Sequence, residues 1–263
     1  MASVALATCR EFPLLHDEEQ LVIPALERLG ITAVPAVWTD TSIDWASFDA
    51  IVIRSAWDYL DDLDGFLAWC ARVSEVTRLL NPADIVEWNT DKHYLLDLAQ
   101  YGVPVVPTRF LEPDDESGAW LPDGDFAHVV VKPAISCGSR DTVRYDLDGD
   151  LSDVPGHIAR LLDADRSVMV QPYLDAVDTV GETALLYFNG EFSHAIRKGP
   201  LLALGVEGEK VEGLFVQEQI DPRTPSAAEL DVAQQVIDAI PGGVERVLYA
   251  RIDLIPDADG NPL

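Results

Sequence analysis

Cysteine, lysine and long apolar segments are scarce in this sequence of 263 residues. The three cysteines, Cys9, Cys70 and Cys137, lie far apart without a CxxC pair, which argues against a disulfide framework and against a structural zinc site. The five histidines show no HxxxH spacing, so any metal is expected to be a hard cation bound by carboxylates. No apolar run approaches the ~18 residues of a membrane span, and no basic segment precedes the first apolar stretch. We therefore expect a cytoplasmic protein without a membrane partner.

Basic residues are few as well. The chain carries 46 acidic and 18 basic side chains, a formal net charge of -28, which argues against binding to nucleic acid or to anionic membranes. High solubility is the simplest explanation of this charge. In so acidic a chain, a lysine on a buried-looking pattern requires an anion as its partner. The four lysines are Lys92, Lys132, Lys198 and Lys210.

The first part of the chain has the pattern of an open α/β domain. Apolar runs at 4–7, 31–38 and 50–53 predict buried strands, and the apolar spacing of 17–29, closed by Gly30, predicts a helix. Strands that alternate with helices form parallel sheets covered on both faces. Ligands of such sheets bind beyond the carboxyl ends of the strands, which here are Thr8-Cys9 and Arg54 to Tyr59.

The remainder predicts two α+β lobes. Helices are expected at 91–101 and 226–240, the second started by Thr224 or Ser226 with Glu229 behind it. Asn189-Gly190 predicts a two-residue hairpin turn. Strands are expected at 128–131, 168–170, 183–188, 191–196 and 249–255. We divide the chain into an N-terminal α/β domain (1–85), a central lobe (86–174) and a C-terminal lobe (175–263).

Five segments in this order resemble the ATP-grasp family, and the resemblance covers nearly the whole chain. It implies an α/β fold with α+β lobes, in which an N-terminal open parallel α/β domain precedes two lobes that clamp ATP. It also implies an enzyme, a carbon–nitrogen ligase that uses ATP and Mg²⁺. The segments are Asn89-Thr90-Asp91-Lys92, the strand end Lys132-Pro133, the loop Ser136-Cys137-Gly138-Ser139-Arg140, the hinge Gln171-Pro172-Tyr173-Leu174, and Arg251-Ile252-Asp253.

The triphosphate of ATP needs cations or backbone N–H groups around it. Lys132 ends an apolar strand and precedes a proline, so its ammonium requires an anion. By resemblance Lys132 binds the α- and β-phosphates with help from Lys92, for which a solvated helix position is the alternative. The loop is expected to cover the phosphates through Ser136, Gly138 and Ser139, because small side chains let N–H groups approach oxygen closely.

The resemblance also implies where the rest of the nucleotide binds. Gln171, Tyr173 and Leu174 belong to the hinge that binds adenine, with Leu174 offering its N–H. Asp178 lies at the spacing of the family's ribose-binding residue, and an exposed acidic loop residue is the equal alternative. One of the neighbours Arg197 and Lys198 is expected to meet the γ-phosphate, where charge builds during transfer.

Arg251 and Asp253 share one face of the last predicted strand. The arginine suits an acyl phosphate or a substrate carboxylate, and the aspartate suits Mg²⁺. A structural Arg–Asp pair is the alternative. In the family, further metal ligands follow on a return strand. Asp257 to Gly260 begins such a hairpin, and we expect the return strand beyond Leu263, as in a truncated lobe, because the hairpin would otherwise leave an unpaired edge.

Three stretches resemble a small branch of the family that contains cyclo-ligases of cycloserine biosynthesis: Thr8 to Pro13, Arg54 to Tyr59, and Arg197 to Pro200. This branch implies that O-ureido-D-serine is phosphorylated on its carboxylate and then closes a ring. Lys132, Arg197 and Arg251 are the expected catalytic residues. The Arg54 loop suits a small zwitterion, with Arg54 for a carboxylate and Asp58 for an amine. Its remaining expected substrate-binding residues are Ser55, Trp57 and Tyr59.

Other functions stay open at this point. A two-substrate ligase similar to glutathione synthetase or D-alanine–D-alanine ligase, a plain carboxylate kinase and a non-catalytic ATP-binding regulator all fit the same nucleotide site. Trp57 and Tyr59 are equally well explained as packing aromatics. The expected partner is a small amino-acid substrate, and a homodimer is left open.

Overall fold

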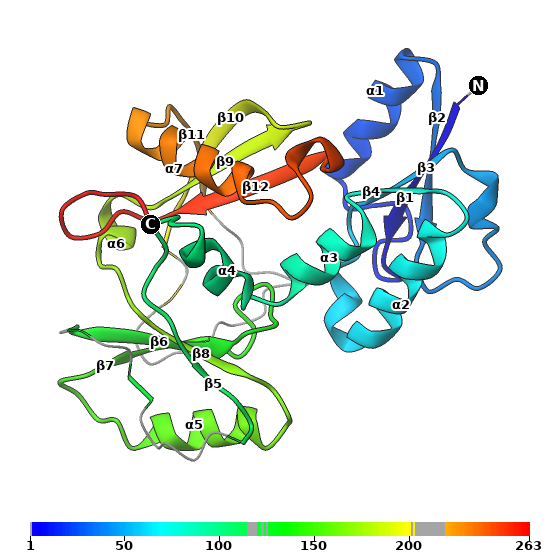
Figure 1. Cartoon of the computed structure of the whole chain (residues 1–263). Helices are drawn as coiled ribbons and strands as arrows, with labels where there is room; N and C mark the ends of the chain where they lie inside the picture. Colours follow the sequence, from blue (N-terminus) through cyan, green and yellow to red (C-terminus); the bar gives the residue numbers. More distant parts are fainter. Residues whose placement is uncertain (1, 115–119, 122–123, 125, 201, 203–218) are drawn as a thin grey trace. The chain divides into compact units, whose positions relative to one another are not determined.

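The computed structural model describes residues 2–114, 120–121, 124, 126–200, 202 and 219–263. The chain divides into two compact units (Figure 1). Unit 1 comprises Met1–Asn89 and Val244–Tyr249, and unit 2 comprises Thr90–Gly243 and Ala250–Leu263. The division into 1–85, 86–174 and 175–263 stays a prediction. Lys210 lies outside the described residues.

Unit 1 contains the parallel sheet that the sequence predicts. Strands β1 (Ala2–Thr8), β2 (Ile31–Val37), β3 (Ala50–Ile53) and β4 (Arg78–Leu80) lie in the order β2-β1-β3-β4, and every neighbouring pair is parallel. The predicted helix at 17–29 is a short 3-10 turn followed by α1 (Val22–Arg28). Strand β3 is followed by the 3-10 turn η3 (Trp57–Asp61) and helix α2 (Leu63–Ser74), and β4 is followed by helix α3 (Ala83–Thr90).

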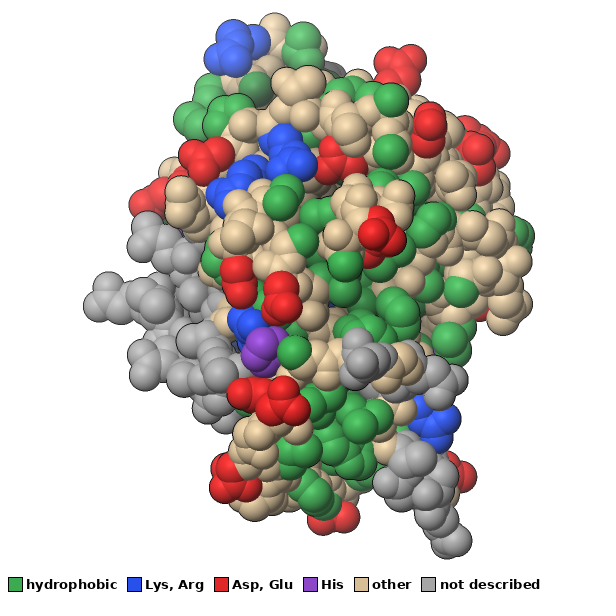
Figure 2. All heavy atoms as spheres, turned by 90° about the vertical axis from the view of Figure 1, so that its left-hand side faces the viewer, with side chains coloured by type: hydrophobic (Ala, Val, Ile, Leu, Met, Phe, Trp, Pro, Cys, Tyr) green, Lys and Arg blue, Asp and Glu red, His purple; other side chains and the backbone are tan. Residues whose placement is uncertain are grey.

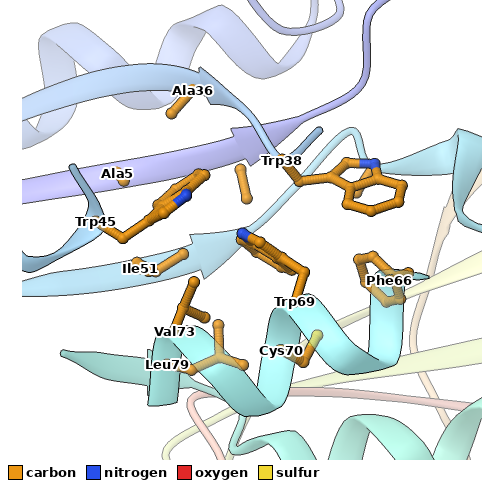
Figure 3. Close-up of a cluster of buried hydrophobic side chains, with 12 residues drawn as sticks. Ala5, Ala36, Trp38, Trp45, Ile51, Phe66, Trp69, Cys70, Val73 and Leu79 are labelled. Atoms are coloured by element: carbon orange, nitrogen blue, oxygen red, sulfur yellow. The ribbon is translucent and has the colours of Figure 1, made fainter. Parts of the chain in front are cut away.

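Aromatic rings dominate the core of unit 1 (Figure 3). Trp69 of α2 is fully buried, and its ring centroid lies 5.2 Å from that of Trp45 and 5.7 Å from that of Phe66. Trp38, which follows β2, contacts Phe66 edge-on at 5.3 Å. Each large ring buries on the order of 200 Å². This cluster therefore fixes α2 against the sheet and, with it, the strand ends where ligands are expected.

The first sheet of unit 2 is antiparallel. Its order is β5-β8-β6-β7, formed by β5 (Arg109–Leu111), β8 (Val168–Pro172), β6 (His128–Pro133) and β7 (Val143–Asp146). Helix α5 (Asp153–Leu162) packs Val154, Ile158 and Leu161 against the buried valines of this sheet. The predicted helix at 91–101 is shorter, because α4 runs from Tyr94 to Gln100.

The second sheet of unit 2 has the order β11-β10-β9-β12. It consists of β9 (Glu182–Phe188), β10 (Glu191–Lys198), β11 (Ile220–Arg223) and β12 (Tyr249–Leu254). The hairpin turn between β9 and β10 is confirmed, since Asn189 and Gly190 both have positive φ, at 50° and 80°, as a type I′ turn requires. The four-residue helix α6 (Ala176–Thr179) precedes this sheet in the chain.

Helix α7 (Ala227–Asp238) begins with a capping box. Ser226 Oγ accepts from the Glu229 N–H at 3.2 Å, and the Glu229 carboxylate accepts from the Ser226 N–H at 2.6 Å, which satisfies two of the N–H groups left free at a helix start. Of the two predicted starting residues, Ser226 is therefore the cap. The predicted turn at Asp257 is also present, and Ile255 and Leu263 exchange backbone hydrogen bonds of 3.1 and 2.9 Å.

The surface reflects the composition. Figure 2 shows acidic side chains spread over the face in view, with lysine and arginine confined to a few small groups. This distribution follows from the net charge of -28. Among the described residues, no helix is both long and apolar enough to cross a membrane.

Candidate active site

Two lysines expected to bind phosphate lie near one another in unit 2. Lys92 follows α3, and its ammonium donates to Ala134 O at 3.1 Å, Ser136 O at 2.8 Å and Ser136 Oγ at 3.2 Å. Burial, and next the charge of Lys132, lower the pKa of Lys92 to about 8. Burial also lowers the pKa of Lys132, although Glu182 opposes this. Two neighbouring cations with this desolvation penalty are stabilised by an anion placed between them.

The loop after β6 is fixed at both of its ends. Lys92 binds its first residue, Ser136, as described above. At its far end Asp141 accepts from Arg160 at 3.0 Å and from Arg166 at 2.6 Å. Between these anchors Gly138 and Ser139 adopt left-handed backbone, with φ of 58° and 57°. Such a turn directs successive N–H groups to one side, which is the arrangement expected of a phosphate loop.

His93, directly after Lys92, joins the start of α4 to the first sheet of unit 2. Its ring stacks on Phe110 at 4.1 Å between centroids, and its two nitrogens lie 2.6 Å from Asp91 Oδ1 and 3.0 Å from Glu112 Oε1. Burial opposes protonation, but Asp91 and Glu112 outweigh it and raise the pKa of His93 above its ordinary value of 6.5. The protonated ring therefore stabilises the segment that carries Lys92.

This geometry predicts a pH-dependent stability. A histidine whose pKa is raised on folding stabilises the protein fully below its unfolded pKa of 6.5, and the stabilisation disappears as the pH rises through the folded value. We expect the difference in unfolding temperature between wild type and His93→Gln to be largest below about pH 6.5 and to shrink at higher pH. Thermal unfolding from pH 5.5 to 8.5 measures it. His194→Gln, on exposed β10, is the control, and an equal difference at every pH would contradict the prediction.

A second group of predicted residues surrounds Glu182 at the start of β9. Lys198 Nζ lies 2.8 Å from Glu182 Oε1 and 3.6 Å from Asp253 Oδ2. Arg251 binds Asp253 with two hydrogen bonds of 2.8 Å each. The Arg251–Asp253 pair that was the alternative to a metal-binding role is thus present, but it belongs to a larger charged cluster. We call Glu182, Lys198, Arg251 and Asp253 the β9–β12 cluster.

The charges of the β9–β12 cluster depend on one another. Burial and the neighbouring Asp253 raise the pKa of Glu182, against the effect of Lys198. Burial acts to raise the pKa of Asp253 too, but Arg251 and Lys198 outweigh it and hold that pKa below its ordinary value. Tyr94 of α4 also interacts electrostatically with this cluster, because burial, and next the charge of Asp253, raise the pKa of its hydroxyl. Lys132 interacts with Glu182, so both groups of predicted residues belong to one electrostatic neighbourhood.

A β-bulge determines which cation of the Arg197-Lys198 pair joins this cluster. Next to the turn, Phe192 pairs with Tyr187, but the register shifts by one residue between Phe192 and His194. Lys198 consequently pairs with Glu182. In a ladder without the bulge, Arg197 would lie opposite Glu182.

Arg197 instead lies opposite Thr183, whose hydroxyl donates to Glu229 of α7. Paired residues of an antiparallel ladder share a face, so Arg197 is on the face that α7 contacts. Its guanidinium donates to Val180 O at 2.6 Å and to Thr179 O at 3.3 Å. The catalytic role of Arg197 stays a prediction. Of the two neighbours expected to meet the γ-phosphate, Lys198 is the one that lies in the β9–β12 cluster.

The predicted hinge residues lie at the end of β8 and directly after it, in unit 2. Gln171 is buried, and its side-chain amide nitrogen donates to Thr108 Oγ1 at 2.8 Å. One of the two N–H donors of this amide is therefore already used. The Tyr173 N–H donates to His128 O at 2.9 Å, and the Tyr173 hydroxyl donates to Asp178. Leu174 lies just beyond the strand and is half-buried. Asp178 therefore has protein partners at the hinge.

Oxygen ligands in the β9–β12 cluster suit magnesium in kind. Asp253 and Glu182 are neighbouring carboxylates, the hard donors that Mg²⁺ prefers. Within the described part of the chain, no group of three or more histidine, cysteine, aspartate or glutamate side chains is arranged to hold a metal. Magnesium keeps several waters when it binds with one or two carboxylates and substrate phosphates, so this donor set fits it.

The expected substrate loop lies in unit 1, after β3. Arg54 Nη2 donates to Glu19 Oε1 at 2.9 Å, and the fully buried Ser55 donates its hydroxyl to the same carboxylate. The His16 N–H donates to Ser55 Oγ at 3.3 Å, and the Cys9 N–H donates to Ser55 O at 3.1 Å. The ends of β1 and β3 therefore meet, as a parallel sheet requires. Arg54 Nε is buried without a partner among the described residues.

The other residues of this loop have packing partners. Trp57 contacts Phe12 edge-on at 5.3 Å between centroids, and Tyr59 lies 5.4 Å from Phe66 at the aromatic core. Asp58 accepts from Trp38 Nε1 at 2.6 Å. Packing contacts explain the position of Tyr59 and part of that of Trp57. The hydrogen bond from Trp38 leaves Asp58 fewer free lone pairs with which to accept from an amine. Their substrate-binding roles stay predictions.

Sequence reasoning missed three charged residues: Glu19, which accepts from Arg54, Glu182 of the β9–β12 cluster, and Arg144, whose guanidinium donates to Asp178 at 3.1 Å. Glu182 directly precedes the strand expected at 183–188 and is the first residue of β9. The hairpin signal at Asn189-Gly190 indicates a pairing of Glu182 with Arg197 or Lys198, so that signal could have found it. Glu19 lies in a run of exposed acidic residues, and no sequence pattern sets it apart.

The chain is similar to known proteins over its whole length. A family described as the N-terminal domain of D-cycloserine synthetase DcsG matches residues 4–81. The cycloserine biosynthesis protein DcsG of Streptomyces lavendulae is 36% identical over 276 residues, covering 100% of this chain and 89% of that protein. A crystal structure of D-cycloserine synthetase DcsG has a TM-score of 0.84 at 33% identity, covering 100% and 89% of the two chains. A RimK domain ATP-grasp protein of Sphaerobacter thermophilus DSM 20745 shares the fold, with a TM-score of 0.65 at 18% identity and coverage of 100% and 88%.

Proposed function

The chain belongs to the family of the cycloserine biosynthesis protein DcsG, and we propose that it closes the cycloserine ring from O-ureido-D-serine at the expense of ATP. It has the ATP-grasp fold and is an ATP-dependent ligase that forms a carbon–nitrogen bond. The fold and enzyme class predicted from the sequence are thereby confirmed. The identity of the substrate in this chain is the proposal.

The observation that carries the proposal is the gathering of cations in unit 2. In a chain with a net charge of -28, Lys92 and Lys132 lie close enough to depress the pKa of Lys92, and Lys198 and Arg251 lie in the adjoining β9–β12 cluster. This charge suits a triphosphate. We assign Lys92, Lys132 and the backbone of Ser136 to Ser139 to the phosphates, Lys198 to the γ-phosphate, and the hinge residues with Asp178 to the nucleoside.

The chemistry then consists of two displacements. The substrate carboxylate attacks the γ-phosphorus, with Lys132 and Lys198 stabilising the transferred charge, and gives an acyl phosphate and ADP. The oxyamino nitrogen of the same substrate attacks the acyl carbon and loses its proton, Arg251 stabilises the oxyanion, and phosphate leaves. The carbamoyl group on that nitrogen is then hydrolysed by water to carbon dioxide and ammonia, which leaves cycloserine. Arg54 and Ser55 are the proposed substrate contacts in unit 1.

Mg²⁺ supplies charge neutralisation at the transferring phosphate when it is bound. Asp253 would hold it, with Glu182 as the adjacent carboxylate. ATP and Mg²⁺ are therefore the proposed cofactors and a small amino acid the proposed partner. A cytoplasmic location and a homodimer stay predictions.

The decisive test supplies O-ureido-D-serine, ATP and Mg²⁺ to the purified protein without any second amine. We expect ADP, phosphate and the cyclic product in equal amounts. The physical reason is that an intramolecular nitrogen has an effective concentration far above that of a free amine. Product mass and coupled ADP assay measure the outcome, and the protein without substrate gives the background ATP hydrolysis.

Two results would contradict the cyclisation. Turnover that appears only when a separate amino acid is added would assign a two-substrate ligase. ADP release with substrate but without a new carbon–nitrogen bond would assign a carboxylate kinase. Either result leaves the ATP site in place, because both alternatives use the same cations.

A further inference from the structure

Arg144 is an enclosed arginine next to the hinge. It lies on β7, the edge strand beside β6 (Figure 1), and its side chain is 11% exposed. Its guanidinium carbon lies 3.5 Å above the centre of the Tyr173 ring. A guanidinium at this distance binds an aromatic face by cation–π attraction and stacking. Arg144 therefore contacts the hinge by stacking on the ring of Tyr173.

The same guanidinium holds the acidic residues that follow the hinge. Nη1 donates to Asp178 Oδ2 at 3.1 Å, and Nη2 donates to Asp175 Oδ1 at 3.3 Å. His128 Nδ1 lies 3.4 Å from Nη2. Nε is buried and has no partner among the described residues. An unsatisfied buried donor is costly, so the orientation of this side chain is set by Tyr173, Asp175 and Asp178 rather than by satisfaction of all its donors.

These contacts fix Asp178 from two sides. Its Oδ1 accepts from the Tyr173 hydroxyl and its Oδ2 from Arg144, while the Tyr173 N–H donates to His128 O at 2.9 Å. A carboxylate has about four lone-pair sites, so Asp178 retains acceptor capacity for two further donors. A pair of vicinal hydroxyls supplies two such donors.

We propose that Arg144 is a positioning residue for the nucleotide, which sets the Asp178 carboxylate and the Tyr173 ring so that Asp178 accepts from the ribose hydroxyls of ATP. This inference rests on the proposed nucleotide site. It identifies Arg144 as the residue that makes Asp178, an exposed aspartate on the four-residue helix α6, a fixed acceptor. Arg144 itself touches neither the phosphates nor the reacting atoms in this assignment.

Lysine at this position would keep the charge and lose the geometry. An ammonium cannot donate to Asp175 and Asp178 in the planar fork of a guanidinium, and it cannot stack on Tyr173. Arg144→Lys therefore tests whether Arg144 positions Asp178 and Tyr173 or only balances the charge of the aspartates. Tyr173→Phe removes only the hydroxyl that fixes the other carboxylate oxygen and retains the ring.

The experiment compares the binding of ADP and 2′,3′-dideoxyADP, each with Mg²⁺, by isothermal titration of the purified protein. For wild type we expect ADP to bind at least about tenfold more tightly, the effect of hydrogen bonds to a charged group. Arg144→Lys is expected to weaken ADP binding about tenfold and to leave dideoxyADP binding within about twofold. Tyr173→Phe is also expected to reduce the preference for ADP over dideoxyADP. Arg246→Lys, which alters another Arg–Asp pair, in unit 1, is the matched control and should change neither constant.

A double substitution provides the second criterion. If Arg144 acts through Asp178, Arg144→Lys should have no further effect on ADP binding in an Asp178→Asn background. Additive losses would overturn the proposal, as would an unchanged preference for ADP in both Arg144→Lys and Tyr173→Phe. Equal weakening of both nucleotides would assign a purely structural role and overturn it too. If wild type binds no ADP at all, the proposed nucleotide site itself is wrong and this inference falls with it.

Discussion

Replacing Lys132 with methionine is expected to reduce ATP turnover by about a thousandfold, the scale for loss of a preorganised charge at a transferring group. The fold should be retained, because methionine has a similar length and removes a cation whose pKa burial already lowers. Removing Lys132 relieves the desolvation penalty of its ammonium, and Glu182 keeps Lys198 as its partner at 2.8 Å. We therefore expect an unchanged or higher unfolding temperature together with the loss of turnover. Steady-state ADP release and thermal unfolding of the same preparation measure both quantities.

The control for Lys132→Met is Arg28→Met, which removes a cation from the exposed end of α1 in unit 1. It should turn over at the wild-type rate. Wild-type turnover in Lys132→Met would refute the phosphate assignment. Equal losses in the two variants would show that the chain responds to its net charge rather than to the position of Lys132.

Asp253→Asn is expected to lower the maximal rate at least about a hundredfold and to raise the Mg²⁺ concentration at half-maximal rate. A neutral amide is a poor ligand for a hard divalent cation. The substitution also weakens the two 2.8 Å hydrogen bonds from Arg251 and removes one of the two carboxylates that support the protonated form of Lys198. A Mg²⁺ titration of ADP release measures both effects.

Asp259→Asn is the matched control, because this exposed aspartate lies six positions later in the chain, on the turn after β12. Its Mg²⁺ response should equal that of wild type. A wild-type midpoint and maximum in Asp253→Asn would show that the Arg251–Asp253 pair is structural.

Local signals in the sequence predicted the elements that depend on local chemistry. The hairpin at Asn189-Gly190 was predictable because a type I′ turn requires positive φ at both residues. The capped start of α7 was predictable to within two residues because Ser226 and Glu229 satisfy each other's backbone donors. The parallel sheet of unit 1 followed from its largely apolar segments at 4–7, 31–38 and 50–53, between which lies a segment with helical spacing.

The choice between Arg197 and Lys198 shows where such signals stop. The two residues are adjacent, and strand alternation sends them to opposite faces. Which one faces Glu182 depends on one extra residue at the bulge near Phe192 and His194. No turn or glycine signal marks this bulge in the sequence, since it arises from how the hairpin twists and packs. A one-residue shift thus changes the candidate for the γ-phosphate.

The networks around Arg144 and Arg54 were beyond sequence reasoning for a different reason. Their partners come from segments that the chain order separates: Arg54 binds Glu19, 35 positions earlier, and Arg144 binds Asp178, 34 positions later. Periodicity indicates which residues face the core but not which charges meet across elements. Most acidic residues of this chain are exposed and follow no distinctive sequence pattern. The few that form ion pairs with arginines of other elements are therefore identified only from the structure.

The aromatic core of unit 1 has a spectroscopic consequence. Trp38, Trp45, Trp57, Trp69 and Trp88 belong to unit 1, and unit 2 contains Trp120 as the remaining one of the six tryptophans. The intrinsic emission of the protein therefore originates almost entirely from unit 1, which carries the Arg54 loop. An emission change on adding the amino acid would register events in unit 1, and events at Lys92 and Lys132 of unit 2 would remain nearly invisible to the same measurement.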